Sequence, residues 1–184
     1  MSIGRGAVML ELRKPRVEDE ASLRAADREF AEEGNDFNFA SGLAGAVSFA
    51  EYLDRLERWS RALDLPEGYV PWTQLIGVVG SEVVGCLSLR HRLTDALRTV
   101  GGHIGYGVVR SQRRKGHGTE MLRQALPFCA ALGIERALVT CDEDNVASVK
   151  VIERNGGVME NITDDPVLAV RKRRYWIDVQ AQLL

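Results

Sequence analysis

The residues best suited to chemistry in this sequence form a short cationic, glycine-rich segment, Arg113-Arg114-Lys115-Gly116-His117-Gly118-Thr119. Glycines at positions 116 and 118 allow successive backbone amides to turn toward one point. The positive end of a following helix adds about half a charge there. The cations directly before the glycines supply partners for phosphate oxygens. The segment therefore predicts a binding site for an anion such as a phosphate.

Two familiar phosphate-binding motifs are excluded. The sequence contains no G-x-x-x-x-G-K-S/T string, and Met121 stands where a dinucleotide-binding G-x-G-x-x-G motif needs its third glycine. A G-x-G pair by itself also occurs in many tight turns. The identity of the anion must therefore come from the residues around this loop.

The elements that position the loop follow from the spacing of apolar residues, whose period switches between about 2 and about 3.6 and so indicates a mixed α/β chain. The pattern predicts strands over 7–13, 73–79, 82–90, 103–109, 135–141, 157–163 and 173–179, and helices over 17–33, 48–63, 119–132 and 145–155. Ser48 and Glu51 form a capping-box pair, and 91–102 is predicted to be a loop. The cationic segment then lies between a strand and a helix of a right-handed crossover.

Residues Arg113 to Gly118 match the (Q/R)-x-x-G-x-(G/A) motif of the GNAT superfamily of acyl-CoA-dependent N-acyltransferases. The resemblance continues over 103–157, including a helix that begins at Asn145 and ends at Gly156, and it is weakest over 35–70. The segments 145–157 and 174–177 are similar to a group of bacterial predicted acetyltransferases. The resemblance implies one domain over 1–184. It also implies a central mixed sheet of about seven strands, splayed between the fourth and fifth and flanked by about four helices.

The resemblance also implies a donor site for acetyl-CoA as co-substrate. Pantetheine lies between the splayed strands on the backbone of the first, where Gly105 and Gly107 indicate close approach of a ligand or another backbone. The pyrophosphate takes the amides of 114–119. Asn145 and Ser148 contact the donor or order the second strand, although a plain helix cap explains Asn145 equally well. The implied donor-binding set is Tyr106, Gly107, Val108, Arg113, Arg114, Lys115, Gly116, His117, Gly118, Thr119, Asn145 and Ser148.

The implied reaction is direct attack of a primary amine on the thioester carbonyl, polarised by strand amides. An amine with the lysine pKa of about 10.4 lies roughly 3.4 units above pH 7, so removing its proton costs about 4.6 kcal/mol. Candidate bases are His103, Asp142 and Glu143. A histidine hydrogen-bonded within the sheet is the alternative for His103.

Ile152 stands where many family members place a tyrosine that protonates the departing thiolate. A thiol of pKa about 8.5 leaves as thiolate at pH 7 at a cost of about 2 kcal/mol, so the reaction can tolerate the absence of this tyrosine. Tyr106 is a candidate to replace it as the proton donor.

Two hypotheses about function follow: an N-acetyltransferase acting on a small molecule, peptide or protein amine, and a non-catalytic acyl-CoA sensor. Nucleic-acid binding is disfavoured because no aromatic residues interleave with the cations.

Composition is that of an ordinary soluble globular protein of 184 residues, with 27% charged residues and a net charge of −2. Residues 11–70 carry a net charge of −6 and residues 85–125 one of +6. This polarity suits an anionic ligand in the middle and a cationic one near the N-terminal half, or two solvated faces. The acidic N-terminal half could line a cleft for a cationic acceptor together with four aromatic residues, and the alternative is that most of these belong to the core: Phe37, Phe39, Trp59 and Trp72.

Three cysteines without a C-x-x-C pair argue against a disulfide framework or structural zinc site and fit a cytoplasmic location. No metal is predicted. The least polar stretch, 42–50, is far shorter than the roughly 20 residues of a membrane span, and no apolar secretion-signal core precedes Glu11. We expect neither membrane nor nucleic-acid partners, and either a monomer or a homodimer.

Overall fold

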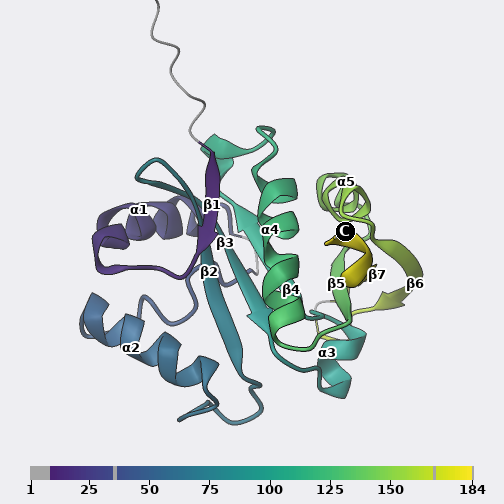
Figure 1. Ribbon diagram of the computed structural model, residues 1–184, viewed down its shortest axis with the longest axis horizontal. Coiled ribbons are helices and arrows are strands. Elements are labelled where there is room, and N and C mark those ends of the chain that lie inside the picture. The colour runs from purple at the N-terminus through teal and green to yellow at the C-terminus, as the bar shows by residue number, and fades with distance from the viewer. Residues whose placement is uncertain (1–8, 35–36, 168, 184) are drawn as a thin grey trace, which may run out of the picture.

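The computed structural model describes residues 9–34, 37–167 and 169–183. The strands are β1 (Leu10–Arg13), β2 (Trp72–Val79), β3 (Glu82–Arg90), β4 (Ile104–Val108), β5 (Arg136–Asp142), β6 (Val158–Asp164) and β7 (Arg171–Asp178). The α-helices are α1 (Glu20–Ala31), α2 (Phe49–Ser60), α3 (Asp95–Thr99), α4 (His117–Ala131) and α5 (Val146–Arg154). Figure 1 shows these elements in place.

The strands form one seven-stranded sheet in the order β1-β2-β3-β4-β5-β7-β6. Strands β4 and β5 run parallel, and the other described neighbours are antiparallel. Only one pair, Ile104 with Val139, joins β4 to β5 in register. The predicted mixed sheet, splayed between its fourth and fifth strands, is therefore confirmed.

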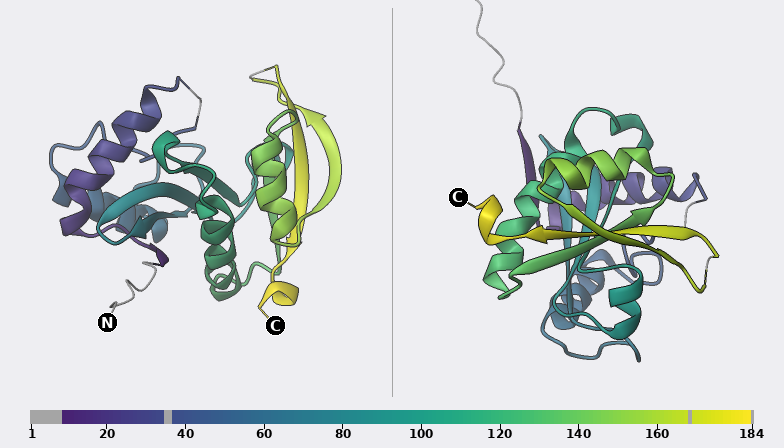
Figure 2. Two further views of the ribbon diagram at one scale, coloured as in Figure 1. Left: turned by 90° about the horizontal axis from the view of Figure 1, so that it is seen from above. Right: turned by 90° about the vertical axis from the view of Figure 1, so that its right-hand side faces the viewer.

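Two apolar clusters cover the two faces of the sheet. Helices α1 and α2 pack over β2 and β3 on one face, while α4 and α5 lie on the other (Figures 1 and 2). Glycines 77 and 85 let α4 lie close to the sheet, because a β-carbon at either position would meet the sulfur of Met121 at 2.8 Å. The position of α4 matters because its N-terminus follows the cationic loop.

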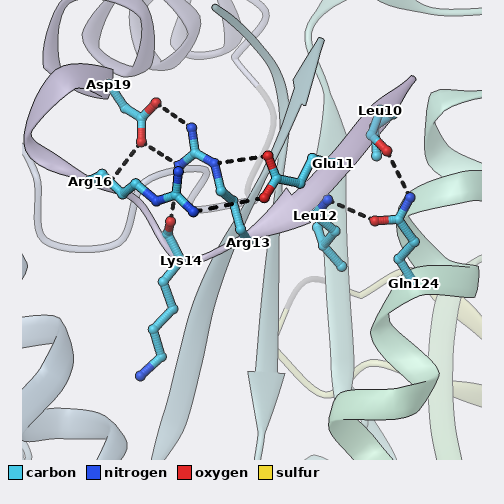
Figure 3. Close-up of polar contacts among 8 residues, drawn as sticks. All are labelled: Leu10, Glu11, Leu12, Arg13, Lys14, Arg16, Asp19 and Gln124. Atoms are coloured by element: carbon cyan, nitrogen blue, oxygen red, sulfur yellow. Dashed lines mark hydrogen bonds and ion pairs between the residues drawn. The ribbon is translucent and has the colours of Figure 1, made fainter. Parts of the chain in front are cut away.

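Helix α4 also holds the edge strand β1. The side chain of Gln124 accepts a hydrogen bond from the Leu12 amide and donates one to the Leu10 carbonyl, each at 2.8 Å (Figure 3). Arg13 at the end of β1 forms a two-pronged ion pair with the buried Asp19, at 2.6 and 2.8 Å (Figure 3). The two Gln124 contacts occupy backbone groups that an edge strand otherwise leaves unpaired, while the ion pair fixes the end of the strand.

The structure corrects several predicted boundaries. The segment 91–102, predicted as a loop, contains α3, whose N-terminus is capped by the Thr94 side chain. With α3, the described chain has five α-helices, in agreement with the prediction of about four. Helix α2 begins after Ser48 as predicted but ends at Ser60 rather than near Leu63, because Ala62 and Asp64 adopt left-handed conformations. The predicted start of the first strand, residues 7–8, lies outside the described residues.

Candidate functional site

The cationic loop joins β4 to α4 and turns sharply before the helix. Arg114 and Gly116 both adopt left-handed conformations, with φ of 64° and 85°, and the helix begins at His117. No hydrogen bond from an amide of residues 114–119 occurs among the described residues, whereas the Glu120 amide donates to the Gly116 carbonyl at 3.1 Å. A row of free amides at a helix N-terminus is the arrangement that binds phosphate groups.

The cationic side chains of this loop divide into two groups. Arg113 is used by the protein itself: its Nη2 pairs with Glu33 at 2.7 Å and its Nε donates to the Val108 carbonyl at 2.9 Å. Lys115 is exposed and bonds only to Gln112 among the described residues, while Arg114 is exposed with no such bond. Arg114 and Lys115 are therefore the cations available to an anion at the loop.

The remaining loop residues line the first turn of α4. His117 is half-buried, and burial together with the charge of Lys115 lowers its pKa. A β-carbon on Gly118 would lie 3.4 to 3.8 Å from Val151, Tyr106 and Val108, between α5 and β4. The carbonyl of Thr119 accepts a hydrogen bond from Asn155 at 3.2 Å. The first turn thus faces the space between the splayed strand and α5.

The splayed edge of β4 presents backbone groups to this space. The Val109 amide donates to Val84 of β3, so the odd-numbered residues of β4 face β3. Residues of a strand alternate in direction, so the backbone groups of Tyr106 and Val108 face β5. The pairing with β5 is a single residue pair at Ile104, so these groups lie along the gap. The structure therefore brings the Tyr106 backbone, predicted to hold pantetheine, to the gap, while the amide of Gly107 faces β3.

The glycines of β4 have a different use from the one predicted. A β-carbon on Gly107 would lie 2.8 Å from Phe30 and 3.1 Å from Phe37, and one on Gly105 would lie 3.2 Å from Phe37. Aromatic rings from the α1 side therefore occupy the space that these glycines leave. The close approach that the glycines indicated is made by the protein's own rings.

His103 lies at the closed end of the splay. Its amide donates to the Leu138 carbonyl at 2.7 Å, and its Nδ1 accepts from the Leu138 amide at 3.0 Å. Burial, followed by the charges of Arg98 and Arg90, lowers the pKa of His103 to about 4. The ring is therefore neutral at pH 7, with its proton on Nε2. In this geometry neither ring nitrogen offers a free lone pair, which favours the sheet-bonded alternative over the predicted base.

The other predicted catalytic side chains also have partners. Glu143 pairs with Arg171 at 2.9 Å, and Asp142 pairs with Lys172. The Tyr106 hydroxyl donates to Ser148 Oγ at 3.2 Å, and burial raises the pKa of Tyr106. That bond joins β4 to α5 across the open side of the gap. The roles of these side chains in catalysis stay predictions.

At the start of α5 the predicted helix cap is confirmed. The Asn145 side chain accepts from the Ser148 amide at 3.0 Å. Ile152, which replaces the expected tyrosine, is fully buried. The two polar residues predicted from the family motif thus stand together at the gap side of α5, with Ser148 linked to Tyr106.

A cavity of about 300 Å³ opens on the α1 and α2 face of the sheet. Its lining residues are Ser41, Gly68, Tyr69, Val70, Trp72, Ser88, Arg90, Thr94, Ala96 and Leu97. Trp72, predicted to line a cleft for a cationic acceptor, does line this cavity, but the described lining contains an arginine and no carboxylate. Phe39 is a core residue, 3% exposed. Arg90 was missed because a single arginine at the end of an apolar strand carries no motif.

Among the described residues, no helix is long and apolar enough to cross a membrane. No group of three or more histidine, cysteine or acidic side chains in this part of the chain is arranged to hold a metal ion.

Comparisons with known proteins agree with this geometry. The structure resembles RimJ of Mycobacterium smegmatis, solved with CoA-disulfide, at a TM-score of 0.70 and 20% identity over 96% of this chain and 88% of that one. It also resembles yncA of Salmonella typhimurium, a putative acetyltransferase solved with acetyl-CoA, at a TM-score of 0.62 and 14% identity over 95% of each chain.

A third similar structure is the ribosomal-protein-S5-alanine acetyltransferase of Vibrio fischeri, with a TM-score of 0.66 and 14% identity over 92% of this chain and 93% of that one. At these identities the likeness establishes the fold. No curated protein matches the sequence. The family model described as the acetyltransferase (GNAT) domain matches residues 9–158, most of the chain. This protein therefore belongs to the GNAT family of acetyltransferases.

Proposed function

We propose that this protein transfers an acetyl group from acetyl-CoA directly to a primary amine of a small molecule, peptide or protein. One observation carries the proposal. The amides of residues 114–119 have no partner among the described residues, and they stand at the end of a strand whose pairing with its parallel neighbour stops after one residue pair. A diphosphate at these amides directs the attached pantetheine along the gap.

The residues present fit acetyl-CoA. The free amides, with Arg114 and Lys115 at their rim, would hold the pyrophosphate, and the backbone of Tyr106 would hold pantetheine. The rest of the implied donor set, including Arg113, Asn145 and Ser148, stays part of the proposal. Acetyl-CoA supplies a thioester, which an amine attacks without an acyl-enzyme. Backbone amides facing the gap would stabilise charge on the carbonyl oxygen.

The proposed binding site of the amine is the cavity on the α1 and α2 face of the sheet. The amine must lose its proton before it attacks, and this cavity favours that loss. Arg90 lines the cavity, and no carboxylate of the described residues does. A nearby positive charge and removal from water both disfavour the ammonium form, so they lower the pKa of an amine bound there. This effect supplies part of the roughly 4.6 kcal/mol that deprotonation at pH 7 requires.

Gly118→Trp tests the donor site. The indole would fill the space bounded by Val151, Tyr106 and Val108, so we expect acetyl-CoA binding, measured by calorimetry, to be lost. Gly45→Trp is the matched control, because Gly45 is exposed and a β-carbon there meets nothing within 4 Å. Donor affinity that is unchanged in a folded Gly118→Trp protein would refute the placement of the diphosphate.

Ile152 favours a second candidate, an acyl-CoA sensor without turnover, because it replaces the tyrosine that would protonate the leaving thiolate. Calorimetry with acetyl-CoA, combined with a free-thiol assay over a panel of amines, separates the two. Saturable binding without CoA release on any amine would support the sensor. Amine-dependent release of CoA would support the transferase.

The proposal includes one domain over 1–184 and a cytoplasmic location. Cys86, Cys129 and Cys141 are free and buried, which suits a reducing compartment. We propose no metal, nucleic-acid or membrane partner, and a monomer or homodimer as the assembly.

A further inference from the structure

Arg90 is a mostly buried cation whose partners do not balance its charge. Its Nη1 donates to the carbonyls of Gly101 and Gly102, at 3.0 and 3.2 Å, and its Nε and Nη2 make no hydrogen bond within the described chain. No carboxylate among the described residues lies within ion-pair distance. Burial lowers the pKa of Arg90. A buried guanidinium without a counter-ion is costly, so an anion from outside the chain would stabilise it.

Arg90 also lies beside the point where the strands part. Ser88 of β3 is paired in register with Gly105 of β4, so the two share a face of the sheet, and Arg90, two residues on, shares it too. A β-carbon on Gly105 would lie 3.6 Å from Nη1 and 3.8 Å from Nη2 of Arg90. The guanidinium therefore lies over β4 one residue before Tyr106, whose backbone faces the gap.

The cavity that contains Arg90 has the dimensions and walls of a small-ligand site. Its volume of about 300 Å³ is at the small end of the range of about 300–1,000 Å³ for ligand pockets. Tyr69 and Trp72 form part of its wall with ring centroids 5.6 Å apart, and Leu97 adds apolar surface. An amino-acid-sized ligand fits better than a large one, and the free guanidinium donors match a carboxylate.

We propose that the acceptor is a primary amine that also carries a carboxylate, and that Arg90 binds this carboxylate and so orients the amine toward the gap. The inference rests on the proposed acetyl transfer and narrows its substrate class. The carboxylate has two sources, a free amino acid or an acidic side chain near the N-terminus of a peptide. The size of the cavity favours the free amino acid.

The test compares free amino acids with their α-amides, which differ only in the carboxylate. We measure kcat/KM for CoA release with both members of each pair. The amide is the less basic amine and has more free base at pH 7, so a preference for the acid cannot come from amine basicity. The expected preference for the acid is at least about tenfold, the scale of a charge-assisted hydrogen bond.

Arg90→Gln should abolish this preference, because the amide still donates to a backbone carbonyl but carries no charge. Arg90→Lys keeps the charge without the two-pronged geometry and should retain part of the preference for the acid. Arg92→Gln is the matched control: Arg92 is exposed and does not line the cavity. Thermal unfolding checks that each variant is folded, and the acid-to-amide ratio in Arg90→Lys decides the question if Arg90→Gln does not fold.

Four outcomes are distinguishable. The inference is supported if the preference for the acid over the amide is lost in the Arg90 variants and kept in Arg92→Gln. If the preference is confined to peptides with Asp or Glu at the second position, the carboxylate belongs to a peptide. Acetyl transfer with equal kcat/KM for acid and amide, or with an unchanged ratio in the Arg90 variants, overturns the inference and leaves the transferase intact. Donor binding without transfer to any amine overturns both.

Discussion

His103 shows how a single side chain can fix the junction of two strands. Its Nδ1 accepts the Leu138 amide at 3.0 Å, a place that a backbone carbonyl takes in a regular sheet. The residue that pairs with it lies 35 positions away in the sequence. Because this partner is distant in the sequence, the sequence alone could not show whether His103 acts as a catalytic base or as a structural hydrogen-bond acceptor.

The buried neutral ring predicts a specific dependence of stability on pH. The pKa of His103 is about 4 in the folded protein and about 6.5 when unfolded, so between these values the unfolded state binds more protons. The contribution is fully present above about pH 6.5 and is lost as pH falls toward 4, amounting to about 3 kcal/mol. Denaturant unfolding between pH 4.5 and 7.5 should show this slope.

His103→Asn is the informative variant for that measurement. Its side-chain oxygen can still accept the Leu138 amide, but it does not titrate, so this part of the pH dependence should disappear. A structural role predicts that the Asn variant keeps turnover, while His103→Ala loses turnover and keeps donor affinity. Equal loss of turnover in both variants would return His103 to the list of bases.

At the scale of elements, regular periodicity made most of the fold predictable. The hairpin of β2 and β3 appears close to its predicted bounds because apolar runs flank a Gly80-Ser81 turn. Helix α3 was missed because a five-residue helix is too short to show a helical period. The loop before α4 was predictable from glycine and charge. Arg90 was not, because only the register of β3 and β4 places it beside the gap.

The closed end of the splay predicts a strong effect of Gly102→Ala. Gly102 has a φ of 62°, and a β-carbon would lie 2.4 Å from the Leu138 carbonyl oxygen, so the two strands must separate there. Gly133→Ala is the control, since Gly133 has a φ of 72° with nothing within 4 Å. We expect Gly102→Ala to lower the free energy of unfolding by about 1–3 kcal/mol more than the control. Equal losses in denaturant titrations would mean that the contact with Leu138 imposes no constraint.

At the scale of the whole molecule, the gap divides the sheet into two parts that few strand contacts join directly, while one apolar cluster with α4 packs against both. Strands β1 to β4 lie on one side and β5 to β7 on the other, and Figure 2 shows the second group with α5 set apart from the first. Between residues 101–108 and the second part, the described hydrogen-bonded links are one strand pair, the His103–Leu138 bonds, the Gly101–Thr140 bond and the Tyr106–Ser148 bond. A donor in this gap would bridge the two parts.

Hydrogen exchange and thermal unfolding test whether the donor joins them. Without donor, the amides of Tyr106 and Val108, which face the gap, should exchange faster than those of Gly105 and Gly107, which are paired with β3. CoA at 100 times its Kd stabilises a folded protein by about 2.7 kcal/mol, which at this chain length raises the Tm by roughly 5–10 °C. It should slow exchange at Tyr106 and Val108 far more than at the glycines, because only the former face the bound ligand. Equal protection of all four amides would show that CoA stabilises the fold from elsewhere and that the gap between β4 and β5 is not its site.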